Sequence, residues 1–168
     1  MLALWLPLLS CILLLAGAAI LLAAAVHDVI ARTVPNWMAA TLAVIGLASQ
    51  ILHGRPLVSV ACALVVFLAA ALCWRAGWLG GGDVKLLGAA TLLVPPGDVV
   101  GFIAAVALIG AGLALIYLAG SRIVTAPGPH RPERLLARAA RIERWRMRRG
   151  CPLPYACAIA AGFMFVTL

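Results

Sequence analysis

The stretch "MLALWLPLLSCILLLAGAAILLAAAV", residues 1–26, contains no charged side chain. It is longer than the roughly 20 apolar residues with which a helix crosses the hydrocarbon core of a bilayer. A signal peptide normally begins with Lys or Arg and has a shorter apolar core, although the alanines at 23–25 resemble a cleavage-site context and keep that alternative open. We therefore predict a first membrane helix over about 3–27.

The rest of the chain has the same character. Only 13 basic and 5 acidic residues occur among 168, the hydrophobic fraction is 65%, and the mean hydropathy is +1.14. Such a chain cannot cover a soluble domain with polar side chains. Further apolar segments lie at about 37–52, 57–74, 84–95, 99–120 and 152–168. Because backbone polar groups must be satisfied within each segment in lipid, we predict helices. The fold class is therefore an all-α polytopic membrane bundle of about six transmembrane helices, forming one domain over 1–168.

The basic residues predict the orientation, because cytoplasmic loops carry the excess of Lys and Arg. If both termini lie outside, Arg32, Arg75, Lys85 and the nine arginines between 122 and 149 fall inside, and Arg55 falls outside. The net charge of +8 is then a signal of membrane topology, and we predict no nucleic-acid partner.

The segment 121–150 is a cytoplasmic basic loop or helix. Within 131–149, Leu135, Ile142 and Trp145 recur at helical spacing beside a row of arginines. This pattern predicts a basic amphipathic helix on the anionic inner leaflet. A disordered basic loop that only fixes the topology is the alternative.

The side chains that could bind a metal ion are scattered along the sequence. The five cysteines form no CxxC pair and the three histidines are far apart, so we predict packing roles for the cysteines and neither a metal nor another cofactor. His27 stands next to an aspartate but points elsewhere on a helix, which favours packing or headgroup contact.

Two of the five acidic residues remain unexplained by turns or arginine pairing. Asp28 closes the first apolar segment and Asp83 precedes the fourth, so the predicted topology places both at the cytoplasmic face. Each could merely end a helix. Two carboxylates held close together share a proton, and such a pair can activate water against a peptide bond. The glycines before Asp83 predict a loop that lets a substrate backbone approach. Asn36, after Pro35, is predicted to cap the second helix.

Three motifs together resemble those of the type IV prepilin peptidases. "GGGDVKLL" (80–87) is similar to the GxGD signature, "DVIARTVPNW" (28–37) to the first-aspartate motif and "PLPYACAIAAG" (152–162) to the last-helix motif, with Ala156 where Gly is usual. The resemblance implies that Asp28 and Asp83 are catalytic. It implies substrate-binding roles for Gly80, Gly81, Gly82, Lys85, Pro35, Asn36, Pro154 and Tyr155.

The resemblance further implies an aspartic endopeptidase of the bacterial inner membrane. It would cleave the short basic leader of a prepilin or pseudopilin at the cytoplasmic face. The chain is similar to the short form that serves Flp/Tad-type pili, because the cytoplasmic segment with paired cysteines does not precede the first motif, so we expect no N-methyltransferase activity. The alternatives are a small proton-coupled transporter that uses the same aspartates, or a structural membrane component of a secretion system.

Overall fold

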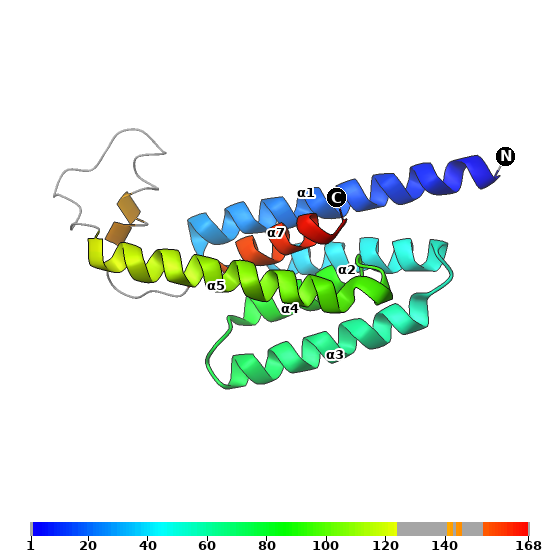
Figure 1. The fold of residues 1–168 in the computed structure, drawn as a ribbon. Helices are drawn as coiled ribbons and strands as arrows, with labels where there is room; N and C mark the ends of the chain where they lie inside the picture. Colours follow the sequence, from blue (N-terminus) through cyan, green and yellow to red (C-terminus); the bar gives the residue numbers. More distant parts are fainter. Residues whose placement is uncertain (1, 124–140, 143, 146–152, 168) are drawn as a thin grey trace. The chain divides into compact units, whose positions relative to one another are not determined.

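The computed structural model describes residues 2–123, 141–142, 144–145 and 153–167 (Figure 1). Its helices are α1 (Leu2–Ala31), α2 (Asn36–Leu52), α3 (Pro56–Arg75), α4 (Gly81–Thr91), α5 (Val99–Ile123) and α7 (Tyr155–Thr167), with a 3-10 helix, η1 (Pro96–Asp98), before α5. Each of the predicted apolar segments is thus confirmed as a helix.

The helices have the composition of a membrane bundle. In the described part of the chain, Trp5–Ala31, Pro56–Arg75 and Pro96–Ile123 are long and apolar enough to span a membrane, and Asn36–Leu52 and Tyr155–Thr167 are shorter apolar helices. An all-α membrane protein is therefore confirmed.

The chain divides into two compact units. The first comprises Met1–Ile109 and Pro154–Leu168, and the second Gly110–Leu153. In the second unit, the later part of α5 runs to Ile123 and residues 141, 142, 144 and 145 are helical. The predicted amphipathic helix over 131–149 otherwise lies outside the described residues. Both aspartates and the helices α1, α2, α3, α4 and α7 belong to the first unit.

The short helix α4 lies at the centre of the first unit. It packs against α3, α2 and α7, while α1 packs against α2 and α7, and Figure 1 shows α7 alongside α1. Residues 86–91 of α4 are all buried. A helix of 11 residues is too short to cross a bilayer alone, but protein rather than lipid surrounds it here.

Two local predictions were wrong. The glycines were expected to form a loop, but α4 begins at Gly81, so Gly81 and Gly82 belong to its first turn and Gly80 is the N-cap. Asn36 was expected to cap α2, but Pro35 holds that position without a side-chain cap. The side chain of Asn36 instead makes the contact with Lys85 described below.

Candidate active site

Both aspartates line one cavity of about 260 Å³. The cavity lies where the end of α1, the start of α2 and the start of α4 meet. Its lining consists of Asp28, Arg32, Thr33, Val34, Asn36, Gly80, Gly81, Gly82, Asp83 and Lys85. Residues 55 positions apart in the sequence are therefore brought to the same site.

Asp28 is positioned by the way in which α1 ends. Its side chain is buried, and its carbonyl accepts a hydrogen bond of 2.8 Å from the N–H of Arg32. Arg32 has a positive φ of 56°, which turns the chain away from the helix. The Nδ1 atom of His27 lies 2.6 Å from the carbonyl oxygen of Thr33, so this nitrogen must donate. His27 thus ties the turn that follows Asp28 back to α1.

Asp83 lies in the first turn of α4. Its carboxylate accepts a hydrogen bond from the backbone N–H of Gly80, and its charge interacts with that of Asp28. Negative charge is favoured at a helix N-terminus, where N–H groups point outward. This local setting keeps the carboxylate of Asp83 directed at the cavity beside Asp28.

A third helix end reaches the same site. The N–H of Ala156, in the first turn of α7, lies 3.4 Å from Oδ2 of Asp28. Tyr155, the first residue of α7, is close enough to Asp83 for the carboxylate to act electrostatically on its hydroxyl. The group of Ala156 that contacts Asp28 is its backbone N–H, which a glycine would also have. Alanine in place of the usual glycine therefore does not remove this contact.

Close packing explains two of the three glycines. A Cβ atom on Gly80 would lie 2.8 Å from Oδ2 of Asp83, and one on Gly82 would lie 3.1 Å from Cβ of Val34. A Cβ atom on Gly81 would meet nothing closer than Nε1 of Trp74, at 3.5 Å. A larger side chain at Gly80 would therefore press on Asp83, and one at Gly82 would press on the turn after α1.

The sequence comparison identifies the family. A type IV leader peptidase family model matches residues 13–115, which is more than half of the chain and includes both aspartates. The chain belongs to this family. No curated protein and no solved structure shows a significant similarity to it.

In this member of the family, the structure joins two further motif residues. Nζ of Lys85 donates a hydrogen bond of 2.9 Å to Oδ1 of Asn36, which links α4 to α2 at the rim of the cavity. Pro35 and Pro154 do not line the cavity but immediately precede the helices that supply Asn36 and Ala156.

Sequence reasoning missed three lining residues, Arg32, Thr33 and Val34. The position of Arg32, four residues after Asp28 and just beyond the helix, was the available signal. Among the described residues there is no group of three or more His, Cys, Asp and Glu side chains that could hold a metal ion.

Proposed function

We propose that this protein is an aspartic endopeptidase that removes the leader peptide of a type IV prepilin or pseudopilin. The observation that carries the proposal is the shared cavity of Asp28 and Asp83 in a chain of the leader peptidase family. The family supports a peptidase. The two aspartates offer the chemistry for it.

The mechanism follows from the pair. Because two neighbouring carboxylates cannot both ionise cheaply, they share one proton. The ionised carboxylate takes a proton from water as the water attacks the peptide carbonyl, and the protonated one donates its proton to the carbonyl oxygen. The carboxyl group that received the proton of water passes it to the leaving nitrogen as the C–N bond breaks, and the other carboxylate takes a proton back from a hydroxyl group of the tetrahedral intermediate. The N–H groups of Ala156 and Gly80 hold one carboxylate each in the orientation that this exchange requires.

A groove beside the aspartates supports an apolar substrate. It has a volume of about 440 Å³, lies among residues of α2, α3 and α4, and is lined largely by small and apolar side chains such as Ala43, Ala63 and Gly88. Asn36 and Lys85 line both this groove and the aspartate cavity. A prepilin helix lying in the groove would present the adjoining peptide bond to the aspartates.

The proposed location is the bacterial cytoplasmic membrane, with the aspartates at the cytoplasmic face. The basic leader would then stay in the cytoplasm while the apolar helix enters the bilayer. The transporter alternative is less well supported, because transporters more often place their acidic groups near the middle of the membrane, whereas Asp28 and Asp83 lie near helix ends.

The test is cleavage of a purified prepilin by Asp28→Asn and Asp83→Asn in detergent. Each variant should lose activity by at least about 10³-fold, and the double variant should be no worse, because groups that act as a unit lose their effect together. Asp98→Asn is the matched control, since Asp98 is exposed in η1 and lines no part of the cavity. Substantial turnover by either single variant would contradict the proposal.

A further inference from the structure

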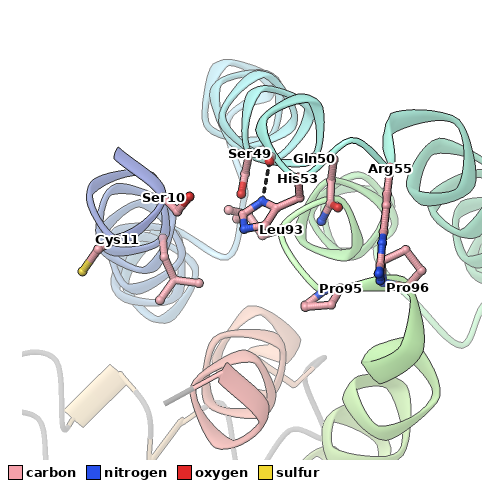
Figure 2. A pocket seen from close by; sticks show the side chains of 10 residues that line it. Ser10, Cys11, Ser49, Gln50, His53, Arg55, Leu93, Pro95 and Pro96 are labelled. Atoms are coloured by element: carbon pink, nitrogen blue, oxygen red, sulfur yellow. Dashed lines mark hydrogen bonds between the residues drawn. The ribbon is translucent and has the colours of Figure 1, made fainter. Parts of the chain in front are cut away.

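A second cavity lies at the other end of the same helices. It has a volume of about 510 Å³ and is formed by the first half of α1, the end of α2, the residue before α3 and the segment between α4 and η1 (Figure 2). The 17 residues of α2 separate it from the aspartate cavity, a length of roughly 25 Å at 1.5 Å per residue. Its volume lies in the range of about 300–1,000 Å³ that is usual for small-ligand sites.

The polar groups of this cavity favour an anion. His53 and Arg55 line it, and no acidic side chain is among its lining residues. Nδ1 of His53 lies 2.7 Å from the carbonyl oxygen of Ser49 and must donate to it, which holds the ring in the position shown in Figure 2. The guanidinium of Arg55 carries a permanent charge and has several donors in a fork that matches phosphate oxygens.

Hydrogen bonds hold one wall of the cavity in place. Gln50 is buried, and its Nε2 donates to the carbonyl oxygens of Leu92 at 3.1 Å and Val94 at 3.2 Å. These bonds fix the segment that leads to Pro95 and Pro96, which line the same cavity as Arg55 (Figure 2). Arg55 is therefore presented beside a segment that hydrogen bonds hold in place.

The surroundings of the cavity are apolar and exposed. On α1, Trp5 and Leu9 are exposed beside the cavity residues Ser10 and Cys11. On α3, Leu57 is 84% exposed, two residues after Arg55. Both helices are candidate membrane spans. A ligand that reaches Arg55 thus meets apolar helix surfaces of the kind that acyl chains cover.

We propose that this cavity binds the phosphate headgroup of an anionic phospholipid, with its acyl chains along the exposed faces of α1 and α3. The phosphate accepts its hydrogen bonds from the guanidinium of Arg55. This site is separate from the aspartates, so the inference does not depend on the proposed peptidase chemistry.

The test measures lipid binding to the purified full-length protein in detergent. Phosphatidylglycerol and phosphatidylcholine are each titrated, and binding is followed by native mass spectrometry and by the shift in unfolding temperature. We expect preferential binding of phosphatidylglycerol, and an affinity about tenfold lower in Arg55→Gln because a charge-assisted hydrogen bond is lost. Arg75→Gln, which removes an arginine at the opposite end of α3, should leave the affinity unchanged.

Three results would overturn the proposal. The first is equal binding of the two lipids, and the second is equal loss of affinity in Arg55→Gln and Arg75→Gln.

The third result would come from a titration with glycerol phosphate, which lacks acyl chains. If it stabilises the protein as strongly as phosphatidylglycerol and this effect is lost in Arg55→Gln, the ligand is a soluble phosphate rather than a lipid. Unfolding of Arg55→Gln without ligand is checked first, and Arg55→Met, which also removes the charge, replaces it in the same comparison if Arg55→Gln does not fold.

Discussion

At the residue scale, the three glycines before Asp83 are identical in the sequence but have different surroundings. The site of a Cβ atom on Gly80 lies 2.8 Å from Oδ2 of Asp83, whereas on Gly81 the nearest neighbour is 3.5 Å away. The first distance requires the carboxylate to move, and the second is an ordinary contact.

This difference predicts different effects of the same substitution. Gly80→Ala should lower the rate of prepilin cleavage by roughly 10–100-fold, because a catalytic group displaced by about 1 Å can lose that much. Gly81→Ala adds the same methyl group and should retain nearly full activity. Both rates are measured with a purified prepilin at equal amounts of folded enzyme. Equal activities of the two variants would show that the position of Asp83 does not limit the reaction.

The sequence predicts the aspartates because acidic residues are so scarce in this chain. It does not predict the bond between Lys85 and Asn36, because the two residues are 49 positions apart on different helices and only the packing of α2 against α4 brings them together. Arg32 was interpreted as a topology signal alone, since nothing in the sequence shows that its backbone turns at a positive φ.

At the scale of elements, α4 is the helix whose boundaries were predicted least well. The prediction of 84–95 followed the apolar residues and stopped at the two prolines, whereas the helix covers Gly81–Thr91. Glycine has a low helix propensity, but burial among α2, α3 and α7 outweighs it. The residues after Thr91 form a turn, and their carbonyls bond to Gln50 of α2, a contact that periodicity cannot reveal.

Because α2 packs closely on this turn, we expect that a side chain larger than that of glycine is not tolerated at the contact. A Cβ atom on Gly46 would lie 2.7 Å from Cβ of Leu92 and 2.9 Å from its backbone carbon, which cannot move like a side-chain tip. Gly46→Ala should therefore destabilise the protein by about 1–3 kcal/mol, as overpacking does. In Gly101→Ala the methyl group meets nothing within 4 Å, so this control should be neutral or more stable by up to about 1 kcal/mol. Thermal unfolding in detergent measures both, and equal unfolding temperatures would mean that α2 and α4 separate easily.

At the scale of the whole molecule, the cavities sit at opposite ends of α2 and carry different charges. The aspartate cavity contains both unexplained acids together with Arg32 and Lys85, and the second cavity contains Arg55 and His53 with no acid. Composition alone predicted a membrane bundle. It could not predict the second cavity, because Ser10, His53 and Pro96 come from segments that are distant in the sequence and are not similar to any of the three motifs.

The last prediction concerns the orientation of this arrangement in the membrane. Arg32 and Lys85 line the aspartate cavity. Arg75 is the last residue of α3, and Arg55 precedes the first residue of that helix. Because basic residues are retained on the cytoplasmic side, alkaline phosphatase fused after residue 54 or 97 should be active outside the cytoplasm. Fusions near 78 and 130 should be inactive. A substrate leader that remains in the cytoplasm can reach Asp28 and Asp83 only in this orientation. Phosphatase activity at 78 without activity at 54 would therefore place the aspartates on the wrong side of the membrane for leader cleavage, and would contradict the proposed location of the reaction.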